Sequence, residues 1–224
     1  MQVLIEAGAD LHTVDHGGNT IFHEAIGWND STRSTWPTIR SGVKTMINLG
    51  VPIKALNHRG RTALHIAAAL KDPGGPQEIN EIFTSRLDFC LQNDLGLDVN
   101  ARDHEGVTPL HLAAATCEVN VWKLIQAGAD VQARTIHGRT SLHFAAAAGK
   151  CNIVDLLVRH YISQSASLDS PDLKGRTALH EAARAGRPES VKILLAAGAS
   201  AKVQDKHGRN PLHAAAEYEE IPAA

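Results

Sequence analysis

The chain has 224 residues, 43% of them hydrophobic and only 4% aromatic, a length that accommodates one large domain or two small ones. Its formal net charge is −2 with both signs interspersed, which argues against nucleic acid or an anionic membrane surface as the partner. Three widely spaced cysteines, no leader segment and no long apolar run predict an intracellular protein, in the cytoplasm or nucleus, without disulfides or membrane insertion.

One short pattern occurs six times and divides the chain into units. Each copy centres on a histidine, and the successive spacings are 42, 46, 32, 37 and 33 residues. A glycine always stands five positions before the histidine and an alanine two positions after it. Threonine precedes the histidine by three positions, except for Asn210 in the last copy. The six histidines are His23, His65, His111, His143, His180 and His213.

Each copy predicts a turn followed by two helices. The glycine permits the positive φ of a tight turn, and the threonine is a good N-cap for the first helix. Apolar residues then recur at helical spacing in the second half of the unit, as in Val154, Leu157 and Val158. Glycines end several of these second helices, at Gly8, Gly50, Gly128 and Gly198.

In chain order, the elements form a single array. Residues 1–10 read as the second helix of a partial unit, and 201–224 as a partial last unit with a first helix and an acidic tail. The five units between them, which carry insertions, are 11–52, 53–98, 99–130, 131–167 and 168–200. The inserted residues are rich in Gly, Pro and Ser and are expected to be loops, at 27–42, 70–80 (with or without a lengthened helix after it) and 160–171. The partial ends favour a piece, or a truncated product, of a longer array.

The repeated pattern resembles the ankyrin repeat, whose hallmark is T-P-L-H-x-A in a unit of about 33 residues. VTPLHLAA at residues 107–114 matches it, and the six copies cover nearly the whole chain. The resemblance implies an all-α ankyrin-repeat solenoid of stacked helix-turn-helix units with β-turn or hairpin loops. It also implies a scaffold or adaptor that binds another protein along its turn tips and first-helix face.

Two stretches imitate half of the zinc-protease motif H-E-x-x-H. FHEAIG (22–27) and LHEAAR (179–184) place Gly27 and Arg184 where the second histidine would stand. The resemblance assigns both stretches to the repeat and makes the six histidines structural, each buried and tying loop to helix by hydrogen bonds. We therefore predict no catalytic residue, no metal site and no cofactor.

Candidate contacts with a partner come from three observations. Tryptophan, which is enriched at interface hot spots, stands in the polar loop 27–42. Arginines that follow the turn glycine, including Arg209, would line up as a basic edge for an acidic partner segment. The side chains on the first-helix face change in charge and polarity from unit to unit. A recognition surface would show such variation, and so would neutral drift. The predicted contact residues are Trp28, Trp36, Arg61, Arg139, Phe144, Arg176, Glu181 and Arg184.

Two further functional classes stay open at this point. The chain is either a monomeric recognition module, or a regulatory or substrate-docking region of a larger enzyme or multidomain protein, or a non-functional fragment. Asn100, in LGLDVN, also resembles the asparagine that some hydroxylases modify in ankyrin domains.

Overall fold

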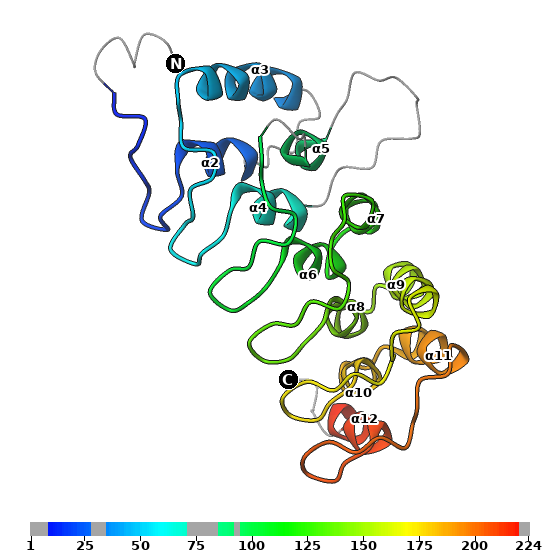
Figure 1. Cartoon of the computed structure of the whole chain (residues 1–224). Helices are drawn as coiled ribbons and strands as arrows, with labels where there is room; N and C mark the ends of the chain where they lie inside the picture. The colour runs from blue at the N-terminus through cyan, green and yellow to red at the C-terminus, as the bar shows by residue number, and fades with distance from the viewer. Residues whose placement is uncertain (1–8, 28–34, 71–84, 92–94, 220–224) are drawn as a thin grey trace.

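The computed structural model describes residues 9–27, 35–70, 85–91 and 95–219. Within these, two layers of helices are stacked into an elongated array, with the turns projecting from one side (Figure 1). The first helices form one layer: α2 (Ile21–Gly27), α4 (Ala63–Ala69), α6 (Pro109–Ala114), α8 (Ser141–Ala148), α10 (Ala178–Arg184) and α12 (Pro211–Glu219). The second helices form the other: α3 (Thr35–Asn48), α5 (Arg86–Leu91), α7 (Glu118–Gln126), α9 (Cys151–Ser163) and α11 (Pro188–Ala196). The all-α repeat solenoid is confirmed.

The start of each first helix follows from its local sequence. Thr108 has the extended backbone of an N-cap, at φ −99° and ψ 165°, and Pro109 occupies the first turn. Proline suits that position because its missing N–H has no helical partner there. The backbone N–H of Thr108 donates to Nδ1 of His111 at 3.1 Å, which completes a capping box.

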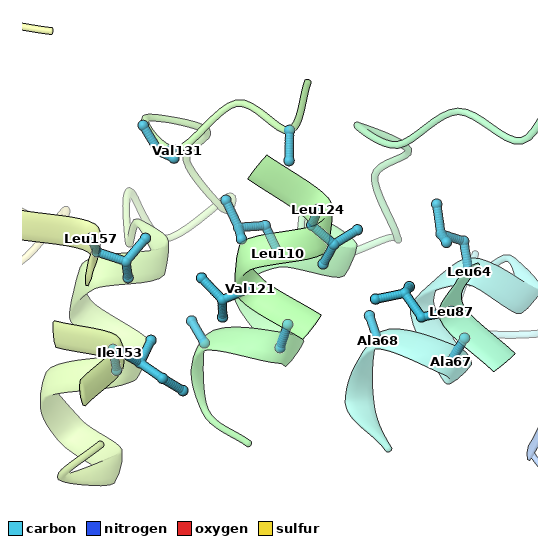
Figure 2. Packing of buried hydrophobic residues seen from close by; sticks show 14 of the residues in the cluster. Leu64, Ala67, Ala68, Leu87, Leu110, Val121, Leu124, Val131, Ile153 and Leu157 are labelled. Atoms are coloured by element: carbon cyan, nitrogen blue, oxygen red, sulfur yellow. The ribbon is translucent and has the colours of Figure 1, made fainter. Parts of the chain in front are cut away.

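The core lies between the two helix layers and continues from unit to unit (Figure 2). Alanines of the first helices, such as Ala67 and Ala68, are at most 2% exposed and let neighbouring helices approach closely. Leucines and valines from the second helices fill the space beside them, as Val121 and Leu124 do with no exposed surface. Each unit therefore buries its apolar residues against its neighbours, as stacked repeats must.

Neighbouring turns are joined by a ladder of backbone hydrogen bonds. The ladder donors are the amides of His58, His104, Ile136, Leu173 and Lys206, each 2.9–3.0 Å from a carbonyl oxygen of the preceding turn. The turn glycines make this approach possible: at Gly60, with φ +74°, an added Cβ would lie 2.5 Å from Cδ2 of His104. Any residue with a side chain would be strained here in both backbone conformation and packing.

Two of the segments expected to be loops are partly helical. Helix α3 begins at Thr35, so the prediction of a loop throughout 27–42 is wrong for residues 35–42; later in α3, Val43 and Met46 are buried one turn apart. Helix α9 continues to Ser163, and the loop predicted at 160–171 is shortened. Burial explains this extension, because Tyr161 is 1% exposed and its hydroxyl donates to the carbonyl of Val131 at 3.0 Å.

Several predictions lie outside the described residues. They concern the helix at 1–8, the loop at 71–80 and the tail after residue 219. After 70–80 the structure describes α5, Arg86–Leu91, while residues 81–84 and 92–94 lie outside the described residues, so the lengthened helix stays a prediction. Residues 211–219 form the expected first helix of the last unit.

Candidate partner-binding face

Five of the six repeated histidines are buried and join one unit to the next. In each, Nδ1 lies 2.8–3.0 Å from the threonine hydroxyl of its own unit and accepts that residue's backbone N–H. Since Nδ1 is an acceptor, the proton of the neutral ring lies on Nε2, which donates to a carbonyl of the following unit. For His23, His65, His111, His143 and His180 these carbonyls belong to Arg61, Val107, Arg139, Arg176 and Arg209, at 3.0–3.1 Å.

Burial disfavours the charged form of four of these rings. It lowers the pKa of His111 and of His143 to about 4, against hydrogen bonds that favour the charged form. Burial also lowers the pKa of His23 and of His65. His213 differs, since it is exposed and its Nδ1 lies 2.7 Å from Oδ1 of Asn210.

The described residues hold no group of three or more histidine, cysteine or carboxylate side chains with the geometry to bind a metal ion. Cys90 is 1% exposed, and burial raises the pKa of its thiol to about 12, which makes the thiolate scarce at neutral pH. Cys117 and Cys151 are half-buried free thiols.

A buried carboxylate gathers three arginines on the first-helix face. Glu181, in α10, has no exposed surface. Its Oε2 accepts hydrogen bonds from Nη2 of Arg184 at 2.9 Å and Nη2 of Arg139 at 3.3 Å. Its Oε1 lies 3.0 Å from Nη1 of Arg176 as an ion pair. Burial alone would raise the pKa of Glu181, but the Arg184 hydrogen bond and the three positive charges outweigh it, and the pKa is lowered.

Phe144 extends this site onto α8. The guanidinium of Arg139 lies over the Phe144 ring, 4.8 Å from its centroid, as a cation–π pair. The edge of the same ring meets His111 at a centroid distance of 5.2 Å. We call the resulting set, which contains five of the eight predicted contact residues, the Glu181 cluster: Arg139, Phe144, Arg176, Glu181 and Arg184.

The comparisons with known proteins agree with the repeated geometry. The family model described as "Ankyrin repeats (3 copies)" matches residues 84–167 and 158–224, which is more than half of the chain. The chain belongs to the ankyrin repeat family. The search of curated proteins found no match. Ankyrin repeats are generally protein–protein interaction modules, and the fold is not in itself enzymatic.

The other arginines of the predicted basic edge are paired within this ankyrin array. Nε of Arg61 lies 2.9 Å from Oδ2 of Asp103, and Nη2 of Arg209 lies 2.8 Å from Oδ2 of Asp205. These two arginines of the edge are therefore neutralised within the array, whereas several arginines converge at Glu181.

The tryptophans are not brought to the Glu181 cluster. Trp28 lies outside the described residues, and Trp36 is in α3, where the structure describes the backbone only. Helix α3 lies at the opposite end of the array from α10 (Figure 1). Asn100 joins two units, since its Nδ2 donates to the carbonyl of Gly128 at 3.2 Å and its Oδ1 accepts the Asp130 amide at 2.8 Å.

An apolar strip runs from the Glu181 cluster toward the start of the chain. Ile66, Leu112 and Phe144 occupy the position after the histidine in three successive units, and all three are half-buried. Glu24 occupies the same position in the first unit and is exposed. The face therefore offers apolar contact beside a cationic group.

Two polar residues of the second-helix layer, both in α7, were not predicted from the sequence. Nδ2 of Asn120, 1% exposed, donates to the carbonyl of Leu70 at 2.9 Å and so caps the end of α4. Nζ of Lys123 lies 2.8 Å from Oδ2 of Asp88 and ties α7 to α5. Asn120 stands within EVNVWKLIQ at a position where the helical spacing of the core residues calls for an apolar side chain, and this mismatch is the sequence feature that could have identified it. None of the helices described is long and apolar enough to cross a membrane.

Proposed function

We propose that this chain is a recognition module that binds a partner protein through its turn tips and first-helix face, as a scaffold or adaptor. The observation that carries the proposal is the Glu181 cluster. Five residues from two neighbouring units converge there, and Arg184 keeps 43% of its side chain exposed.

Preorganisation is the physical advantage of such a face. Arginine side chains lose rotamer freedom when a partner immobilises them, which costs about 0.5–1.5 kcal/mol each. Here Glu181 and Phe144 already hold Arg139 in place, and Glu181 holds Arg176. Less ordering is then left for the moment of binding, so more of the contact energy appears as affinity.

We propose further that the module acts inside the cell, in the cytoplasm or nucleus, and as a monomer. The three free cysteines support a reducing compartment, since none is paired in the structure. The same face would serve equally if the array docks substrates or regulators for a larger protein.

The test is affinity capture from an extract of the native cell, with identification of the retained proteins by mass spectrometry. The wild-type chain is compared with the double variant Phe144→Ala/Arg184→Ala and with Arg159→Ala as a matched control. Arg159 lies on α9, on the second-helix face, with 78% of its side chain exposed. We expect one or more proteins retained by the wild type and the control and lost by the double variant. Equal retention by all three folded chains would contradict the proposed face.

A further inference from the structure

The Glu181 cluster carries more positive charge than its own carboxylates neutralise. Three guanidiniums face two carboxylates, Glu181 and Asp172, the latter paired with Arg176 at 2.9 Å. One positive charge is left in excess. Arg61 and Arg209, by contrast, each pair with at least one carboxylate.

The hydrogen-bonding capacity of the cluster is also unsatisfied. Each guanidinium has more N–H donors than Glu181 uses. Arg184 gives Glu181 one bond from Nη2 and leaves the rest of its side chain 43% exposed. Among the described residues, two buried atoms of the cluster have no hydrogen-bond partner, Nε of Arg139 and Oε1 of Glu181, the latter meeting Arg176 as an ion pair. Arg184 is the most exposed of the three arginines, so its remaining N–H groups are the donors that a partner can reach. A carboxylate suits such a guanidinium because it accepts two parallel N–H bonds.

The apolar strip limits what kind of molecule carries that acceptor. Phe144 and Leu112 lie in the two units before Arg184 and are half-buried on the same face. Stacked helices are about 8–10 Å apart. A segment in the polyproline II conformation has three residues per turn and rises about 3.1 Å per residue, so side chains three positions apart lie on the same side, about 9 Å from each other. Such side chains would thus reach successive units.

We propose that the occupant of this face is a segment of a partner protein in the polyproline II conformation that carries an aspartate or glutamate three residues from an apolar side chain. The carboxylate binds Arg184 and Arg139, and the apolar side chain packs on Phe144. A second apolar residue, three positions farther along, packs on Leu112. This inference rests on the proposed function and specifies the chemistry of the partner.

The probe is a display library of random twelve-residue peptides, selected on the immobilised wild-type chain. Enriched peptides are then synthesised in pairs, with the acidic residue or with its amide (Glu or Gln), and the Kd of each is measured by fluorescence anisotropy. We expect enrichment of an acidic residue three positions from an apolar one. On the wild type, the Gln peptide should bind about tenfold more weakly than the Glu peptide.

Combining the Glu and Gln peptides with protein variants shows which arginine the peptide carboxylate binds. Arg184→Ala leaves two arginines on Glu181, so the fold is retained, and it should weaken the Glu peptide about tenfold while leaving the Gln peptide unchanged. Arg159→Ala, on the second-helix face, should leave both peptides within about twofold of the wild type. Thermal melts of each variant serve as the check on folding.

The outcomes separate this inference from the function on which it rests. Enriched peptides that bind Phe144→Ala more weakly than the wild type but show no preference for an acidic residue would overturn the inference and leave the recognition face in place. Acidic peptides that bind Arg184→Ala as well as the wild type would overturn the assigned contact. A phosphoserine peptide that binds more than tenfold better than its Glu counterpart would replace the carboxylate by a phosphate. A library that yields no binder sensitive to either residue would overturn this inference, and the affinity capture described above then decides the proposed function.

Discussion

Replacement of Glu181 by glutamine tests whether one buried charge holds the face together. The change keeps the shape of the side chain and removes its charge, so Arg139, Arg176 and Arg184 lose their shared counter-ion. Breaking a buried ion pair from one side costs about 3–5 kcal/mol. The three arginines are 27%, 18% and 43% exposed and regain part of their hydration. We therefore expect a loss of about 2–3 kcal/mol in the free energy of unfolding.

The assay is thermal and urea unfolding followed by circular dichroism. For a chain of this size, 1 kcal/mol corresponds to about 2–4 °C, so the melting temperature of Glu181→Gln should fall by about 4–12 °C. Glu189→Gln is the matched control, because Glu189 is 63% exposed and pairs only with Lys192. Its effect should stay within about 0.5 kcal/mol. A Glu181→Gln chain that melts within about 1 °C of the wild type would show that the cluster does not stabilise the array.

Three further predictions concern the framework. Gly60→Ala should destabilise the chain by more than about 1 kcal/mol, because φ is +74° and the new Cβ would meet His104. Gly42→Ala is the control: Gly42 is in a helix with open space around it, so this change should leave the stability unchanged or raise it. The urea midpoints of the two variants decide the prediction, and equal midpoints would contradict it. Asn120→Ala should cost about 1–3 kcal/mol in the same assay, because it leaves the Leu70 carbonyl without its donor, and a loss below about 0.5 kcal/mol would argue against the cap. The pKa of His111 is lower in the folded chain, about 4 against 6.5, so the unfolded chain binds more protons and stability is lost as pH falls from 6.5 toward 4. His143 has the same shift and contributes separately, so the dependence of stability on pH should be shallower in His111→Asn by about 1.4 kcal/mol per pH unit, and an unchanged slope would contradict the shift.

The framework of the fold could be predicted because its determinants are local. The glycine of the turn, the N-cap residue and the histidine lie within six residues of one another in every unit, as Gly106, Thr108 and His111 do, and the N-cap residue is threonine in all units but the last, which has Asn210. Helix ends in the insertions depended instead on distant contacts. The extension of α9 through Tyr161 requires the Val131 carbonyl, 30 residues earlier, and no local pattern announces that bond.

The candidate site shows the same division. Arg139, Glu181 and Arg184 could each be singled out, because each stands at a variable position beside a constant one. That these residues converge could not be predicted, since Arg139 and Glu181 are 42 residues apart and meet only through the stacking of two units. The predicted basic edge likewise overlooked Asp103 and Asp205, which the turns place against Arg61 and Arg209.

The histidine that joins each unit to the next makes every junction chemically equivalent. One side of a unit always presents an imidazole N–H, as His143 does, and the other always presents a backbone carbonyl, as Arg139 does. A backbone carbonyl is the same group whatever side chain the residue has, which is why Val107 can replace arginine at that position without loss of the bond. The hydrogen bond at this junction therefore places no demand on the side chain of the acceptor residue, which is free to differ from unit to unit.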